Sequence, residues 1–191
     1  MSDENLELKV NDETVSIEPK KMYVLLENED SDSGYAAINS YKDHLLITTL
    51  RPEILKEKGV NIEDLCKDDY IRVTQNNQKS DKYQTLTPQN IGVITSYVLG
   101  WVNKHEGKNS VVYIDKYAFQ DMVNNNGDGL SSMRNLAKIL ASRIENTGAS
   151  IIISIDPSAY EGKDHKPLIK QIISTAKETG GAKLDRSNIK F

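Results

Sequence analysis

Two carboxylates occur where parallel α/β proteins often hold a metal ion or a nucleotide. Asp115 follows the apolar run 111–114, and Asp156 follows the apolar run 151–155. Runs of this length, rich in β-branched residues, are typical of strands buried on both faces of a parallel sheet. Each aspartate would then lie at the carboxyl edge of the sheet, where open α/β sheets usually bind their ligands. An aspartate in that position can hold the Mg²⁺ of a bound nucleotide.

A third strand-like run, 44–50, ends beside residues that could bind an anion. Thr49 lies at its end and Arg51 follows it directly. Arg51 is the best single candidate for an anion contact, because a guanidinium donates in pairs to phosphate or carboxylate. An ordinary surface arginine explains the same residue. Asp115 and Asp156 could likewise cap or start the turns that follow them, since an Asp at such a position is a good turn former.

The phosphate loop that would accompany a nucleotide site is absent from the sequence. Its pattern, G-x-x-x-x-G-K-[ST], provides backbone N–H groups that surround the phosphates and a lysine that reaches the terminal ones. The segment where it would lie instead contains Glu27, Glu29, Asp30 and Asp32, which would repel a polyphosphate. The G-x-G-x-x-G fingerprint is also absent, because the segment 127–132 lacks the third glycine and reads as an ordinary turn.

No metal or nucleophile motif replaces the phosphate loop. His44, His105 and His165 are far apart, and none has a second histidine or cysteine at ligand spacing. A calcium loop centred on Gly127 would have methionine at its first and twelfth positions, and the G-x-S-x-G elbow is absent. Cys66 has no nearby histidine to activate it and is expected to be a small buried or half-buried side chain. The sequence therefore predicts no catalytic residue, no metal and no cofactor.

Composition and charge are those of an ordinary globular protein with one main domain. The 191 residues include 24 Lys and Arg against 28 Asp and Glu, a net charge of −4, which argues against a nucleic-acid partner. No apolar run approaches the roughly 18 residues needed to cross a membrane. The first residues lack the basic and apolar parts of a signal peptide, and a single cysteine suits a reducing compartment. We expect a cytoplasmic protein without membrane contact, and the oligomeric state stays open.

Strand-like runs alternate with helical patterns along most of the chain. The strand-like runs are 22–26, 44–50, 70–74, 111–115 and 151–155. Helical spacing predicts helices over 53–58, 87–105, 130–146 and 166–177, and a short amphipathic segment over 35–41. Thr87 is expected to cap the second of these helices, with Pro88 as its first residue. This alternation predicts a three-layer α/β/α fold with a mostly parallel five-stranded sheet, RecA-like or Rossmann-like.

Two segments are predicted to flank this α/β domain of residues 20–177. Residues 1–19 alternate between apolar and polar side chains around an Asn-Asp turn, which predicts a β-hairpin or a loosely held extension. Residues 178–191 form a polar C-terminal tail, which we expect to be poorly ordered. Within the domain, the loop 75–83 is polar, contains lysines and has no apolar anchor, so we expect it to be the most mobile segment.

The order and spacing of five stretches are more specific than any one of them. The stretches are 23–27 (YVLLE), 45–52 (LLITTLRP), 71–74 (IRVT), 111–115 (VVYID) and 151–157 (IIISIDP). Together they resemble the domain-of-unknown-function family 835, which is found mostly in archaea. Members of that family often have an Arg a few residues before the Pro and a Gly after the central Asp. Here Arg51 directly precedes Pro52, and Lys116 follows Asp115.

The resemblance implies a core distantly similar to the RecA and circadian-clock ATPases, with the phosphate loop lost. It also implies signalling or scaffolding, because family members tend to occur beside sensory and regulatory modules. Our leading hypothesis is a non-catalytic module with a degenerate ATPase-like core that binds a protein partner or a small regulatory ligand. The alternative is a nucleotide-binding or hydrolysing enzyme with an unconventional site at Thr49, Arg51, Asp115 and Asp156. A nucleic-acid binder using the lysines of the loop 75–83 and of the tail is a third possibility.

Overall fold

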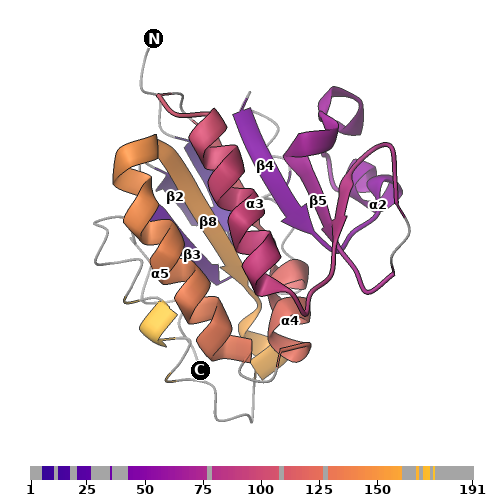
Figure 1. Ribbon diagram of the computed structural model, residues 1–191. Helices are drawn as coiled ribbons and strands as arrows, with labels where there is room; N and C mark the ends of the chain where they lie inside the picture. Colours follow the sequence, from indigo (N-terminus) through magenta and orange to yellow (C-terminus); the bar gives the residue numbers. More distant parts are fainter. Residues whose placement is uncertain are drawn as a thin grey trace.

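A six-stranded parallel sheet is the centre of the computed structural model (Figure 1). The structure describes residues 6–10, 13–17, 21–26, 35, 43–76, 79–107, 110–126, 129–160, 167, 170–172 and 174. The strands of the sheet are β3 (Met22–Leu26), β4 (Asp43–Thr48), β5 (Tyr70–Val73), β6 (Gln84–Leu86), β7 (Ser110–Ile114) and β8 (Ala149–Ile155). Their order is β3-β8-β7-β4-β5-β6, and every neighbouring pair is parallel.

The predicted α/β class is confirmed, and the number of strands is corrected from five to six. The additional strand is β6, which pairs with β5 at the edge of the sheet. Its three residues, Gln-Thr-Leu, have no apolar alternation that would mark a strand in the sequence. Backbone pairing alone defines it, and the pairing continues beyond β5, where the Thr74 N–H donates to the Leu86 carbonyl oxygen at 2.9 Å.

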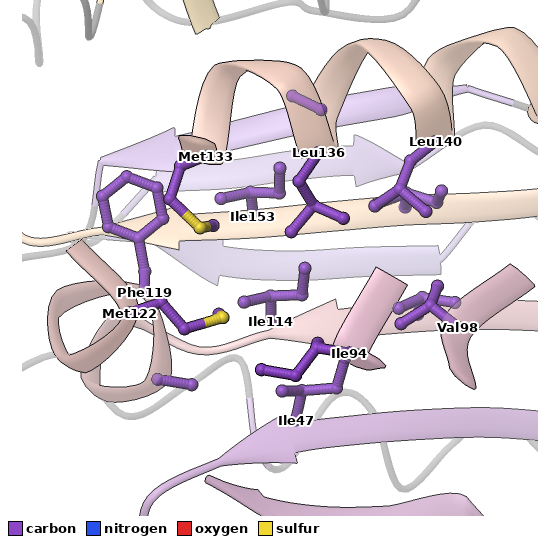
Figure 2. Packing of buried hydrophobic residues seen from close by; sticks show 14 of the residues in the cluster. Ile47, Ile94, Val98, Ile114, Phe119, Met122, Met133, Leu136, Leu140 and Ile153 are labelled. Atoms are coloured by element: carbon purple, nitrogen blue, oxygen red, sulfur yellow. The ribbon is translucent and has the colours of Figure 1, made fainter. Parts of the chain in front are cut away.

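Three helices cover one face of the sheet. They are α3 (Ile91–Lys104), α4 (Lys116–Asn124) and α5 (Gly129–Thr147), and α3 and α5 lie side by side (Figure 1). Alternate residues of the strands face them, so Ile47, Ile114 and Ile153 of neighbouring strands form the floor of the main core (Figure 2). The helices fill this core with fully buried side chains: Ile94 and Val98 from α3, Phe119 and Met122 from α4, Met133 and Leu140 from α5.

The junction between α4 and α5 requires a glycine. Gly129 is the first residue of α5, and a Cβ at this position would overlap the backbone of Val123, near the end of α4. Only a residue without a side chain permits this close approach. Gly129, which belongs to the segment 127–132 read as an ordinary turn in the sequence, therefore has a packing role at the start of α5.

A second core, rich in tyrosine, lies on the opposite face of the sheet. It contains Tyr23, Tyr35, Tyr70 and Tyr113 together with Leu55 of the short helix α2 (Pro52–Glu57). The antiparallel hairpin of β1 (Leu6–Val10) and β2 (Glu13–Ile17) confirms the hairpin that the sequence predicted. Its last residue, Ile17, is fully buried in the second core.

The start of α3 differs from the prediction. Asn90 caps the helix, and its Oδ1 accepts a hydrogen bond from the Val93 N–H at 3.2 Å. Thr87 lies in the preceding turn, where its carbonyl oxygen accepts from the Asn90 N–H at 3.2 Å. Asparagine is at least as good an N-cap as threonine, so the Thr-Pro pair marked the turn before the helix and not its first residue.

Other sequence expectations fall partly outside the described residues or are wrong. Cys66 is exposed, because it precedes a short surface 3₁₀ turn, η2 (Lys67–Asp69). The loop 75–83 does have an anchor, since Tyr83 is half-buried and packs on the second core. The acidic segment 27–34, most of 35–41 and the tail 178–191 lie outside the described residues, as does much of 166–177, although residues 170–172 are helical.

None of the helices in the described part of the chain is long and apolar enough to span a membrane.

Two side chains of α3 attach η2 to the helix. The Trp101 Nε1–H donates to the Asp69 carboxylate at 2.9 Å, and the Tyr97 hydroxyl donates to the Asp68 carbonyl oxygen at 2.9 Å. Burial, and then the charges of Asp68 and Asp69, raise the pKa of Tyr97 to about 12. The Tyr97 hydroxyl therefore stays protonated, and able to donate, through the neutral range of pH.

Replacing Trp101 with phenylalanine is expected to lower the free energy of unfolding by about 1–2 kcal/mol. A phenyl ring fills only part of the space of the buried indole, and the charge-assisted bond to Asp69 is lost. Urea denaturation followed by circular dichroism measures the loss. Tyr97→Phe is the matched control, because it removes a neutral, exposed bond and should cost about half as much or less. Equal losses in the two variants would contradict this ranking.

Candidate functional site

A row of polar side chains crosses the carboxyl ends of five adjacent strands. Thr48 of β4 is in register with Arg72 of β5, which is in register with Thr85 of β6. On the other side of Thr48, the pairing of Ile47 with Ile114 and of Ile114 with Ile153 places Asp115 and Ser154 next in line. All five follow a second-core position by two residues and so share its face of the sheet. We call Ser154, Asp115, Thr48, Arg72 and Thr85 the polar row.

The polar row is buried at one end and open to solvent at the other. Ser154, Asp115 and Thr48 have no exposed surface. Arg72 and Thr85 are only half-buried. The part of the row that is accessible to solvent is therefore at β5 and β6.

Asp115 is hydrogen-bonded through both carboxylate oxygens. Its Oδ1 accepts from the Ala118 N–H at 2.7 Å and so caps α4. Its Oδ2 accepts from the Tyr35 hydroxyl at 2.6 Å, in a fully buried contact between residues 80 positions apart. Its backbone N–H donates to the Ile47 carbonyl oxygen at 3.0 Å, which ties the end of β7 to β4. The interpretation of Asp115 as a cap is confirmed.

Tyr35 is the buried partner of this carboxylate. It is the first described residue after the segment 27–34, in which a phosphate loop would lie. Its ring packs edge-on against Tyr113, with 5.8 Å between ring centroids and 82° between ring planes. Burial, and then the Asp115 carboxylate, raise the pKa of Tyr35 far above its ordinary value. The phenol therefore keeps its proton and serves Asp115 as a permanent donor.

At the open end, Arg72 is held between two neighbouring segments. Its Nε donates to the Thr49 carbonyl oxygen at 3.1 Å, and its Nη1 donates to the Tyr83 hydroxyl at 3.5 Å. Tyr70 contacts the same two segments: its hydroxyl donates to the Leu50 carbonyl oxygen, and its ring centroid is 4.9 Å from that of Tyr83. Burial, and then Tyr83, raise the pKa of Tyr70 above its ordinary value.

The four residues predicted from sequence do not form one constellation. Thr49 is half-buried beside the polar row and bonds Arg72 through its backbone. Arg51 is exposed; its carbonyl oxygen starts α2, and its side chain makes no hydrogen bond or ion pair with any described residue. Asp156 lies two residues beyond Ser154 on β8, where its Oδ1 accepts from the Ser158 N–H at 3.0 Å and the Ser158 hydroxyl at 2.7 Å. The turn interpretation of Asp156 is confirmed.

Arg72 and Tyr35 are among the residues of this edge that sequence reasoning missed. Arg72 has a visible signal, because an arginine inside an otherwise apolar strand, Tyr-Ile-Arg-Val, must place its charge at an opening or beside a partner. Tyr35 has no such signal, since its contact with Asp115 depends on the tertiary fold.

The described residues contain no group of three or more His, Cys, Asp or Glu side chains that could hold a metal ion.

Comparisons with known proteins bear on the fold. No family model matches the sequence, and no curated protein matches it either. A solved structure of Pyrococcus horikoshii OT3 protein PH0250 is similar, with a TM-score of 0.51 and 10% identity over 81% of this chain and 78% of that one. A solved structure of Thermomonospora curvata EccC (ATPases 2 and 3), in complex with a signal sequence peptide, has a TM-score of 0.50 and 10% identity over 98% of this chain and 35% of that one. The second comparison shows a similar fold in about a third of the EccC chain.

Proposed function

We propose that this chain is a non-catalytic α/β module that has an ATPase-like core and binds a protein partner or a small regulatory ligand in signalling or scaffolding. The main support is the state of Asp115. A Mg²⁺ ion needs a carboxylate oxygen that it can reach. Both oxygens of Asp115 accept short hydrogen bonds in a fully buried site, so this aspartate stabilises the fold.

The sequence and the fold comparison support the same proposal. The phosphate-loop pattern is absent, and the segment after β3 contains four carboxylates, Glu27, Glu29, Asp30 and Asp32. The similarity to an ATPase structure concerns the fold alone, which is what a core that lost its nucleotide would keep. The resemblance to family 835 adds that such modules occur beside regulatory domains, and we propose membership of that family.

Isothermal titration calorimetry with ATP and Mg²⁺ tests the proposal. We expect no saturable binding, which corresponds to a Kd weaker than about 1 mM, because the sequence lacks the phosphate loop and both carboxylate oxygens of Asp115 are hydrogen-bonded. The matched control is the Asp115→Asn variant under the same conditions, which should behave as the parent chain does. Micromolar, Mg²⁺-dependent binding that disappears in Asp115→Asn would instead support the nucleotide enzyme.

A further inference from the structure

Arg72 is an unusual residue for its place in the sheet. It belongs to β5, which is paired on both sides, with β4 and with β6. Its side chain lies on the face of the second core, two residues after the fully buried Tyr70, and is half-buried. Arginine is rarely placed in such a strand unless its charge has a partner.

The guanidinium of Arg72 is oriented by two hydrogen bonds within the chain. The Thr49 carbonyl oxygen holds Nε, and the Tyr83 hydroxyl holds Nη1. The Tyr83 ring lies beside the cation, with its centroid 6.0 Å from Cζ. These contacts use two of the five N–H donors of the group, so the rest of the planar fork stays available in one orientation.

Arg72 has no carboxylate partner among the described residues. Within the described part of the chain it forms no ion pair, and its contacts are those to Thr49 and Tyr83. The acidic residues nearest in sequence to this edge, Glu53 and Asp81, are exposed. A half-buried cation loses part of its hydration without an opposite charge to compensate, and an anion from outside would provide that compensation.

The neighbours of Arg72 are suited to an oxyanion. Thr85 is in register with it on β6, and its side chain is half-buried. The exposed cation Lys82 precedes Tyr83 directly in the sequence. The Tyr83 ring provides an apolar wall beside the fork. Arginine forks bind phosphate and carboxylate groups through paired hydrogen bonds.

We propose that Arg72, with Thr85 and Tyr83, forms a binding site for an oxyanion group carried by a small aromatic molecule. The group is a phosphate or a carboxylate, which a guanidinium binds through the same paired donors. The inference rests on the proposed function in one respect: it gives the location and the ligand chemistry for a module that binds a small regulatory ligand. It involves neither Mg²⁺ nor Asp115.

Nuclear magnetic resonance of the ¹⁵N-labelled full chain tests the site. The Arg72 Nε–H cross-peak is assigned by its absence from the Arg72→Lys variant, and phenyl phosphate and benzoate are titrated at constant ionic strength. We expect one or both probes to shift this cross-peak saturably, and the tighter probe identifies the anion class. Arg72→Gln should weaken binding by at least about tenfold, because it removes charge-assisted bonds.

Arg51→Gln is the matched control, an exposed arginine on the same edge, and should change the affinity less than about twofold. Tyr83→Phe keeps the ring and removes the hydroxyl that holds Nη1, so it should weaken binding by about two- to fivefold. If the Arg72→Gln variant does not fold, the titration of the parent chain and the affinity of the Tyr83→Phe variant still test the site.

Two results would overturn the inference. In one, the Arg72 cross-peak does not respond specifically: neither probe shifts it, or the probes shift the other arginine cross-peaks by the same amount. In the other, a folded Arg72→Gln chain binds as tightly as the parent chain. Both leave the non-catalytic module in place. That proposal is overturned by a different result, namely Mg²⁺-dependent ATP binding that Asp115→Asn abolishes.

Discussion

Replacing Asp115 with alanine is expected to lower the free energy of unfolding by about 2–4 kcal/mol. The change removes the N-cap of α4, worth about 0.5–2 kcal/mol. It also leaves the buried Tyr35 hydroxyl without its acceptor, which costs about 1–3 kcal/mol. Urea denaturation followed by the fluorescence of Trp101, the single tryptophan, measures the loss.

Asp156→Ala is the matched control for this variant. Asp156 follows the neighbouring strand β8, but it is half-exposed and bonds only within its own turn. Its removal should cost about 1 kcal/mol or less. If the Asp115→Ala and Asp156→Ala variants unfolded at the same urea concentration, the buried contacts of Asp115 would not stabilise the fold.

Replacing Phe119 with alanine is expected to lower the free energy of unfolding by about 3–5 kcal/mol. The side chain is fully buried in the main core, where Figure 2 shows it beside Met133 of α5. Truncation removes its apolar contacts and leaves a cavity that packed helices cannot close. Thermal or urea denaturation measures the loss.

Gln120→Ala, at the next position of α4, is the control. Gln120 is half-exposed, so this change should alter stability by no more than about 0.5 kcal/mol. Phe119→Leu, which keeps most of the apolar volume, should fall between the two. A cost for Phe119→Ala as small as that of Gln120→Ala would mean that α4 is not held against the sheet.

The fold was predictable from sequence wherever the apolar side chains of a segment form a continuous run or recur at a regular spacing. The apolar runs 111–114 and 151–155 are strands, and α5 buries Met133, Leu136 and Leu140 at the predicted helical spacing. Each pattern is local, so it is visible without knowledge of the neighbouring elements. The strand β6 was missed because its pairing with β5, and not its side chains, defines it.

The site was harder to predict because it depends on strand register. Asp115 and Asp156 both follow apolar runs in the sequence, yet the register places Asp115 in the polar row and Asp156 two residues beyond it. The first is therefore buried against Tyr35, and the second starts an exposed turn. Arg72 and Thr85 lie 13 positions apart in the sequence and become neighbours only when β5 pairs with β6.

The hydrogen bond between Tyr35 and Asp115 could not be predicted from local sequence patterns either. Residues 35 and 115 are 80 positions apart, and no periodicity connects them. Their contact requires the crossover that brings the segment after β3 to the end of β7, across the intervening strand β8. The sequence showed that the phosphate loop was absent, and the fold shows that a phenol now bonds the carboxylate.

A double-mutant cycle between Tyr35→Phe and Asp115→Ala tests most directly whether Asp115 serves the fold. The free energy of unfolding is measured for the parent chain, both single variants and the double variant. We predict a coupling energy of about 1–3 kcal/mol, since either single change removes the same buried hydrogen bond. Losses that add within about 0.3 kcal/mol would contradict this account, because Asp115 would then be free of Tyr35 and available to a ligand.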